Sequence, residues 1–443
     1  MPSLAELRTH ARSIFTAALA AADPYTAVKA HVELDGERLR AGDRSYDLSQ
    51  FDNLLVAGCG KASARMASAL EDWLGDRIAA GLVVVKYGHG VALNKIEVVE
   101  AGHPIPDCAG LEGARRVAEF IRGRAERDLI FFLISGGGSA LLPFPADGLS
   151  LAEKQQTTDA LLKSGATITE VNALRKHLSR LKGGRLAGLV APATTIALIL
   201  SDVIGDVLEA IASGPTAPDN STYENCLAVI DRYRLQEKIP ANVIDYLQRG
   251  AAGEHEETPK PGDPIFEKVQ NLIVGSNRIA VAAARARAAE LGYCTTVLAE
   301  PVEGESRIAA GKLARLVRDL ARDRRADFRP LCVIAGGETT VTVRGNGVGG
   351  RNQEFALAAA VEISGLDNVV VLSGGTDGTD GPTDAAGGLV DGFSLSRGHA
   401  LGLAGEDFLD RNDSHSFLRA TDDLLITGPT LTNVTDIQIA LIC

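Results

Sequence analysis

The chain has 443 residues, 45% of them hydrophobic and 23% charged, so it is long enough for two hydrophobic cores and lacks the composition of a disordered or fibrous protein. Its formal net charge is −12, with 45 basic residues scattered among 57 acidic ones, which argues against a nucleic-acid surface. Because no apolar run approaches membrane-spanning length and the start of the chain lacks a signal-peptide layout, we expect a cytoplasmic enzyme with no membrane partner.

The first half of the chain alternates between strand and helix patterns. Ser3 and Glu6 have capping-box spacing and precede apolar residues at helical intervals, which predicts an amphipathic helix. Short apolar runs then end in glycine or polar turns before helical stretches, at residues 54–57, 81–85, 129–134 and 194–200. This alternation predicts a parallel sheet with crossover helices.

The second half repeats the pattern after a polar, proline-bearing stretch at residues 253–264, which we interpret as a linker. Helices are expected at 223–233 and 240–249 before it, and strands at 271–275, 295–298, 331–335, 369–372 and 424–427 after it. We therefore predict two three-layer α/β domains with mostly parallel sheets, residues 1–252 (Rossmann-like) and 265–443. Whether the last strand, near 436–442, returns to the first domain is left open.

The segment Gly58-Cys-Gly60-Lys61-Ala-Ser63 occupies the position of a first strand-to-helix turn. It matches neither a dinucleotide fingerprint, which needs glycine at Ser63, nor a GxxxxGK[ST] phosphate loop. The next strand ends in Lys86, where an NAD-binding unit would place an acidic residue, so an ordinary NAD site is disfavoured. What remains is Lys61 at a helix start beside flexible backbone, which suits an anion as well as it suits solvent.

A second glycine turn, Ser135-Gly136-Gly137-Gly138-Ser139, follows a fully apolar run. It is therefore expected at the carboxyl end of a buried strand, the edge where open α/β sheets bind ligands. Successive glycines flanked by hydroxyls predict a backbone nest for phosphate or carboxylate oxygens, although such turns also serve close helix packing.

A third glycine-rich stretch, residues 336–354, contains Glu338, Arg351 and Asn352. Its glycines permit close backbone approach, and Arg351 adds a permanently charged planar group at the start of an expected helix. We predict an anion site here, with a glycine-rich hairpin carrying a solvated arginine as the alternative.

Carboxylates follow two strands, Asp202 after the run at 194–200 and Asp377 after the run at 369–372. Both are candidate Mg²⁺ ligands, since one or two protein carboxylates suffice when nucleotide phosphates supply the other ligands; turn formation is the alternative. His103 lies in another loop, where it could donate to an anion. The six cysteines show no metal-ligand spacing, and we interpret them as reduced thiols.

Together, Gly58-Cys-Gly-Lys-Ala-Ser63, Lys86-Tyr-Gly-His-Gly90, Gly102-His-Pro-Ile-Pro-Asp107, Ser135-Gly-Gly-Gly-Ser139, Ser201-Asp-Val-Ile-Gly-Asp206 and Gly349-Gly-Arg-Asn-Gln-Glu354 resemble the glycerate 2-kinase family. Some members of this family carry a hydroxypyruvate reductase label. The resemblance extends to the closing segment at 427–433, where the family often has glycine in place of Leu431. That departure affects the expected shape of the loop.

The resemblance implies an active site in an interdomain cleft, where the γ-phosphoryl group of ATP is transferred to the 2-hydroxyl of D-glycerate with Mg²⁺. Lys61 and Arg351 correspond to the family's basic active-site pair. Around them we predict substrate or nucleotide binding by Lys86, His103, Ser135 to Ser139, Glu338 and Asn352, and metal binding by Asp202 and Asp377.

Two other functions stay open at this point. An NAD(P)H-dependent hydroxypyruvate reductase would account for the label, though not for Ser63 or Lys86. A noncatalytic sensor of sugar phosphates could use the same glycine nests. The oligomeric state, including a homo-oligomer, is not determined by the sequence.

Overall fold

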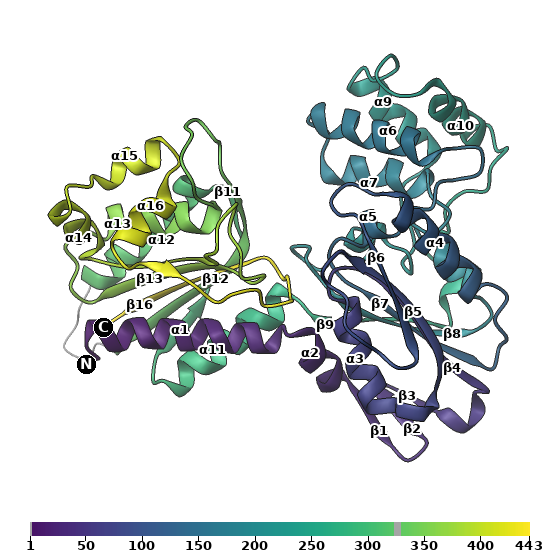
Figure 1. The fold of residues 1–443 in the computed structure, drawn as a ribbon, viewed down its shortest axis with the longest axis horizontal. Coiled ribbons are helices and arrows are strands. Elements are labelled where there is room, and N and C mark those ends of the chain that lie inside the picture. Colours follow the sequence, from purple (N-terminus) through teal and green to yellow (C-terminus); the bar gives the residue numbers. More distant parts are fainter. Residues whose placement is uncertain (1, 323–328) are drawn as a thin grey trace. The chain divides into compact units, whose positions relative to one another are not determined.

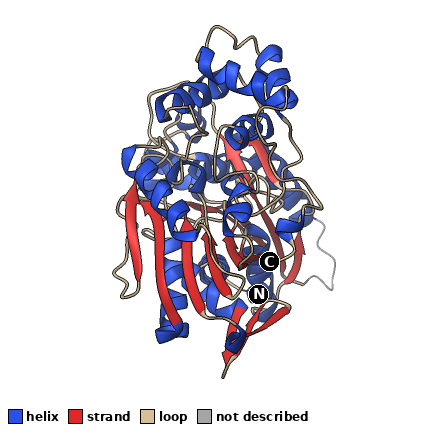
Figure 2. Ribbon diagram, turned by 90° about the vertical axis from the view of Figure 1, so that its right-hand side faces the viewer, coloured by secondary structure: helices blue, strands red, loops and turns tan. Residues whose placement is uncertain are grey.

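The computed structural model describes residues 2–322 and 329–443 and divides into two compact units. The central unit comprises residues 24–274, and the terminal unit combines residues 2–23 with residues 275–443. In both units, strands form sheets whose faces are covered by helices (Figure 2). The α/β fold class is thus confirmed.

The central unit is built on a six-stranded sheet with the order β6-β5-β4-β7-β8-β9 (Figure 1). Its strands are β4 (Asn53–Cys59), β5 (Ile78–Lys86), β6 (Ile96–Ala101), β7 (Asp128–Ile134), β8 (Thr194–Leu200) and β9 (Val269–Gly275). The pairs β4–β5, β4–β7, β5–β6 and β7–β8 are parallel. The order is that of a doubly wound Rossmann-type sheet, whose switch point lies between β4 and β7.

Burial explains why these runs form strands. All seven residues of β7 are buried, as expected for a central parallel strand covered on both faces. Leu55, Ala57 and Cys59 of β4 share one core with Val117 and Ile121 of helix α4 (Cys108–Ile121), following the two-residue alternation of a strand.

The remaining helices of the central unit cover the sheet or form a separate helical layer. The helices are α2 (Pro24–His31), α3 (Ser63–Leu74), α5 (Gly138–Leu141), α6 (Leu151–Lys163), α7 (Ile168–His177), α8 (Arg185–Val190), α9 (Tyr223–Arg232) and α10 (Ala241–Ala251). Helices α6, α7, α9 and α10 lie together in Figure 1 and share a core that includes Leu161, Leu174, Ile230 and Leu247. A small antiparallel sheet contains β1 (Val32–Asp35), β2 (Arg38–Ala41) and β3 (Arg44–Asp47).

The terminal unit has a seven-stranded sheet in which β10-β12-β16-β13-β14-β15 form the main order and β11 pairs with β12. Its strands are β10 (Cys294–Val297), β11 (Val302–Glu305), β12 (Leu331–Thr340), β13 (Val369–Gly375), β14 (Gly387–Asp391), β15 (Leu424–Leu425) and β16 (Asp436–Ile442). Strand β16 runs antiparallel between β12 and β13, while β10 and β11 are parallel to β12.

Helices lie on both faces of the terminal sheet (Figure 1). They are α1 (Leu4–Ala21), α11 (Asn277–Glu290), α12 (Ser306–Arg322), α13 (Arg351–Glu362), α14 (Ser394–Ala400), α15 (Gly405–Asp410) and α16 (Ser414–Ala420). The expected capping box at Ser3 and Glu6 is present, and α1 buries Leu7, Ala11 and Phe15 on one face. Within the described residues, no helix is both long and apolar enough to cross a membrane.

The structure differs from the expected domain limits of 1–252 and 265–443. Helix α1 packs with the terminal unit because Phe15 lies against Gly374 and Arg8 forms ion pairs with the buried Asp391 (2.6 Å) and Asp423 (3.0 Å). The expected linker, residues 253–264, lies inside the central unit, because the run after it becomes β9 of that sheet.

One sheet detail also differs, and the place of the last strand, left open by the sequence, is now defined. The terminal sheet is mixed rather than mostly parallel, because β16 inserts antiparallel to both of its neighbours. That final strand completes the terminal sheet and does not return to the central one.

The turn between β4 and α3 requires glycine at position 60. Gly60 has φ +130°, and a Cβ there would lie 2.5 Å from the Ser135 carbonyl oxygen. We predict that Gly60→Ala lowers the free energy of unfolding by about 2 to 4 kcal/mol, from backbone strain plus steric overlap. Urea unfolding followed by the fluorescence of Trp73, the single tryptophan, which lies in α3, measures the change.

Gly188→Ala is the matched control. It lies in helix α8, and the nearest atom to its Cβ position is 3.8 Å away. Alanine should leave the stability unchanged or raise it by up to about 1 kcal/mol. Equal stabilities of the two variants would contradict the role given to Gly60.

Candidate active site

The glycine turns after β4 and β7 meet at the switch point of the central sheet. The Lys61 amide donates to the Gly136 carbonyl oxygen (2.9 Å), the Ala62 amide to Ser135 Oγ (3.0 Å) and the Ser135 amide to the Cys59 carbonyl oxygen (3.1 Å). Because parallel neighbours end at the same edge, two motifs 75 positions apart form one continuous surface. The structure thus brings Lys61 together with the segment Ser135 to Ser139.

The second turn presents unpaired backbone amides. Within the part of the chain that the structure describes, neither the Gly136 nor the Gly137 amide donates a hydrogen bond. Gly137 has φ +85°, and a Cβ there would lie 3.4 Å from Lys61 Cγ, so the lysine side chain passes directly over this turn. Neighbouring amides of this kind beside a lysine form a nest suited to the oxygens of an anion.

Further basic groups surround this nest. Lys86 ends β5, and the ring of His103 lies over Gly137, whose Cβ position is 3.0 Å from His103 Nε2. Burial, assisted by repulsion from Lys61 and Lys86, lowers the pKa of His103 to about 4. At neutral pH, His103 is therefore an uncharged hydrogen-bonding group in a positive environment.

Asp202 is the carboxylate of this cluster. It lies after β8 and faces Gly136 so closely that a Cβ there would be 3.0 Å from its carboxyl carbon. Burial raises the pKa of Asp202, and Lys61 partly opposes that rise. A carboxylate in this place fits the oxygen ligands that Mg²⁺ prefers, with the remaining ligands left to phosphates and water. Across residues 2–322 and 329–443, no three His, Cys, Asp or Glu side chains gather as a metal site of their own.

In the terminal unit, Arg351 is the first residue of α13 and is held by two carboxylates. Its Nε donates to Asp436 Oδ2 (2.6 Å), its Nη2 to Asp436 Oδ1 (2.9 Å) and its Nη1 to Glu338 Oε1 (2.7 Å). Burial alone would lower the pKa of Arg351. The hydrogen bond to Asp436 and the negative charges of Asp436 and Glu338 outweigh that effect and raise the pKa. Three of its five N–H donors are thereby used, which leaves two for a ligand.

The neighbouring residues hold α13 in place. Asp380 accepts the amides of Asn352 (3.1 Å) and Gln353 (2.8 Å), and so caps the helix that carries Arg351. Burial raises the pKa of Asp380 to about 6, against the effect of those hydrogen bonds. Asn352 is buried and accepts the hydroxyl of Ser373 (2.6 Å), whereas the Glu338 side chain is half-exposed. Ligand binding by Glu338 and Asn352 stays a prediction.

The glycines that precede Arg351 pack against protein atoms. Cβ atoms at Gly345 and Gly347 would collide with residues 411–413, and one at Gly350 would collide with the Asp380 carboxylate. We expected these glycines to let a ligand approach the backbone closely. At these positions, other segments of the chain make that close approach instead.

Two other expected features have local structural roles. Asp377 Oδ1 accepts the amide of Thr379 (3.1 Å), which is the turn-forming alternative to metal binding. Leu431 has φ +61°, a left-handed conformation that favours glycine. The loop thus keeps a glycine-type backbone although this chain has leucine there.

A cavity of about 620 Å³ opens beside the nest in the central unit. His103, Gly137 and Ser139 line it, as do Lys154, Arg175 and Lys182, which no motif in the sequence singled out. The available signal was weak: Lys154 shares the buried face of α6 with Thr157 and Leu161, at positions i, i+3 and i+7. Cys59 lies beneath the nest, and burial raises its pKa to about 11, so it remains a protonated thiol.

Comparison with known proteins is consistent with this geometry. Residues 10–248 match a domain of unknown function, DUF4147, and residues 331–436 match the MOFRL family. Glycerate 2-kinase from Pyrococcus horikoshii is 42% identical over 96% of this chain and 95% of its own length. D-glycerate 2-kinase from Thermotoga maritima is 43% identical over 91% of this chain and 94% of its own.

A solved structure supports the same relationship. The crystal structure of glycerate kinase from Thermotoga maritima superimposes with a TM-score of 0.88 at 40% identity, covering 99% of this chain and 100% of that one. Such identity over nearly the whole length places both units within one family. The chain therefore belongs to the glycerate 2-kinase family.

Proposed function

We propose that this protein transfers the γ-phosphoryl group of ATP to the 2-hydroxyl of D-glycerate, giving 2-phosphoglycerate and ADP. The observation that carries the proposal is the switch-point nest, in which the amides of Gly136 and Gly137, unpaired among the described residues, lie beside Lys61. Phosphoryl transfer depends mainly on positioning and on neutralising charge, and this nest supplies both.

Within this proposal, the residues of the central unit have distinct roles. The nest binds one anionic group, and Lys61 counters charge on the transferring phosphoryl group or on the glycerate carboxylate. Asp202 is proposed to hold Mg²⁺ or to accept the hydroxyl proton; its raised pKa supports the second role, because it makes Asp202 a better base than an exposed aspartate. When bound, Mg²⁺ would neutralise part of the charge on the phosphate oxygens.

Arg351 is proposed to act in the same reaction through the two N–H donors that Asp436 and Glu338 leave available. Asp377 is proposed as a second Mg²⁺ ligand, which its Thr379 bond does not prevent because a carboxylate has further lone pairs. A cytoplasmic location remains a prediction from composition.

A product assay tests the reaction itself. Incubation with ATP, Mg²⁺ and D-glycerate should release ADP, and phosphorus NMR should identify 2-phosphoglycerate. Chelation of the metal should abolish the reaction. Formation of 3-phosphoglycerate would overturn the assigned position, whereas oxidation of NADH or NADPH with hydroxypyruvate would favour a reductase. Binding of sugar phosphates without turnover would favour a sensor.

Lys61→Ala should reduce kcat by roughly 100- to 1000-fold, the usual effect of removing a preorganised charge donor. Lys268→Ala is the control, because Lys268 is a half-exposed lysine of the same unit that pairs with the surface residue Glu126. Steady-state kinetics on both variants, with Trp73 fluorescence to verify folding, measure the effect. Near-normal turnover of Lys61→Ala would remove Lys61 from the mechanism.

Arg351 requires a paired test because it also neutralises the fully buried Asp436. Arg351→Ala should lower the free energy of unfolding by about 3 kcal/mol, since it leaves a buried carboxylate without a partner. Adding Asp436→Asn should restore most of that stability in thermal unfolding, while kcat stays roughly 100- to 1000-fold low if Arg351 acts on the substrate. Recovery of turnover in the double variant would show that the role of Arg351 is structural.

A further inference from the structure

The cavity beside the nest contains buried positive charge. Lys154, Arg175 and Lys182 come from α6, from α7 and from the segment after α7, and all three line the same 620 Å³ space as Gly137 and Ser139. Lys154 is 7% exposed and Lys182 is 2% exposed. Charged groups are seldom buried this deeply unless they are paired.

In the described parts of the chain, these cations bond to carbonyl and amide oxygens and to no carboxylate. Lys154 Nζ donates to the Leu178 carbonyl oxygen (3.1 Å) and Lys182 Nζ to the Leu142 carbonyl oxygen (3.4 Å), while Arg175 Nη1 donates to Asn172 Oδ1 (3.4 Å). Within the described residues, none of the three forms an ion pair. Asp159 also lines the cavity, but its carboxylate is bonded to Lys163 (2.7 Å).

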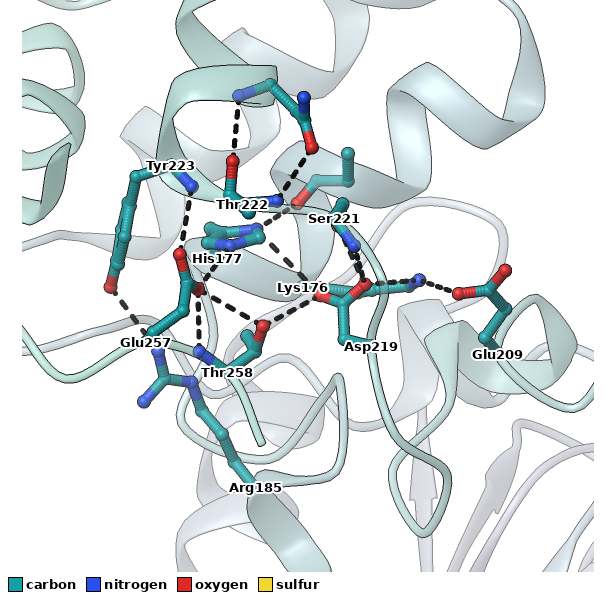
Figure 3. A network of polar contacts seen from close by, with 12 residues as sticks. Lys176, His177, Arg185, Glu209, Asp219, Ser221, Thr222, Tyr223, Glu257 and Thr258 are labelled. Atoms are coloured by element: carbon teal, nitrogen blue, oxygen red, sulfur yellow. Dashed lines mark hydrogen bonds and ion pairs between the residues drawn. The ribbon is translucent and has the colours of Figure 1, made fainter. Parts of the chain in front are cut away.

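The adjacent residue Lys176 provides an internal comparison. It is 4% exposed, as deeply buried as the cavity lysines, but it contacts Asp219 Oδ1 (3.0 Å) and Glu209 Oε2 (3.2 Å). Figure 3 shows Lys176 between these two carboxylates, with Thr258 donating to the other oxygen of Asp219 (3.0 Å). The fold therefore neutralises a buried lysine where the charge has a structural role.

The unpaired cations carry an energetic cost that a bound anion would remove. Burial and mutual repulsion lower the pKa of Lys154 well below its ordinary value, and burial lowers that of Lys182 to about 8. Burial also lowers the pKa of Arg175. A cation without a buried counter-charge destabilises the folded state, and an anion in the cavity would restore the missing partner.

We propose that Lys154, Arg175 and Lys182 form an anion subsite that binds the polyphosphate chain of the nucleotide. This assignment rests on the kinase function proposed above. Three cations exceed what the single carboxylate of a three-carbon acid requires, whereas a polyphosphate carries several charges. The volume lies in the range typical of cofactor sites, and Pro104, Ile105 and Leu162 add an apolar wall for the rest of a nucleotide.

Methionine substitutions separate binding from structure, because methionine is similar in length to lysine but uncharged. Lys154→Met and Lys182→Met should each raise the unfolding temperature of the ligand-free protein, by about 2 to 4 °C, since a buried unpaired charge is removed. The same variants should raise the Kd for ATP and for inorganic tripolyphosphate roughly 10- to 100-fold, measured by calorimetry without metal, with the Kd for D-glycerate unchanged.

Lys176→Met is the matched control. It should lower the unfolding temperature, because it leaves Asp219 buried without its partner, and it should not change either Kd. Lys154→Arg keeps the charge and should retain ATP binding within a fewfold of the unmodified protein.

The proposal is overturned if the unmodified protein binds neither ATP nor tripolyphosphate, or if Lys154→Met and Lys182→Met leave both affinities unchanged. It is also overturned if these variants raise the Kd for D-glycerate but not the Kd for ATP or tripolyphosphate, because the cavity would then bind the acid. Failure of the kinase function has a different outcome: tripolyphosphate binding would still depend on Lys154 and Lys182, but no phosphoglycerate would form.

Discussion

The hydrogen bonds between the turns after β4 and β7 are the constraint on which the site of the central unit depends. Parallel pairing sets Cys59 beside Ile134, and the amides of Lys61 and Ala62 then bond to Gly136 and Ser135. These bonds use the donors that face the neighbouring turn, and among the described residues the amides of Gly136 and Gly137 stay unpaired. The proposed anion site thus depends on strand register as much as on residue type.

Buried charge is treated in two ways in this protein. Arg351, Lys176 and Arg397 each face a carboxylate that is almost wholly buried, namely Asp436, Asp219 and Asp391. Such pairs roughly balance desolvation against attraction and hold segments in a fixed geometry. Among the residues that the structure describes, the lysines of the cavity bond to carbonyl oxygens and to no carboxylate, so their desolvation is not offset there. This difference distinguishes charges that organise the fold from charges available to a ligand.

Much of the central unit was predictable because its signals are local. Fully apolar runs followed by glycine identified β4 and β7, and the second of them predicted that the turn Ser135 to Ser139 would lie at the ligand-binding edge of the sheet. Strand β6 was missed because it is short and partly polar. Lys154 was missed because an isolated lysine in an amphipathic helix usually lies in solvent, and Lys182 because it belongs to no motif in the segment between α7 and α8.

The terminal unit was less predictable because its determinants are remote in sequence. An apolar run does not indicate whether its strand is parallel or antiparallel to its neighbours, so residues 436–442 could not predict that β16 inserts antiparallel between β12 and β13. Asp436 is 85 positions from Arg351, and no spacing rule connects them. The same holds for α1, whose partners begin beyond residue 274; its amphipathic pattern predicted a helix but not the sheet on which it packs.

The arrangement of α1 and β16 has a consequence for synthesis on the ribosome. Helix α1 is made well before the sheet that covers Phe15, because that sheet needs β16 between β12 and β13, and β16 is translated more than 400 residues later. At roughly 5 to 20 residues per second, the apolar side of α1 stays uncovered for tens of seconds while the central unit can already fold. During synthesis, the terminal unit therefore completes its core only after the central unit has been made.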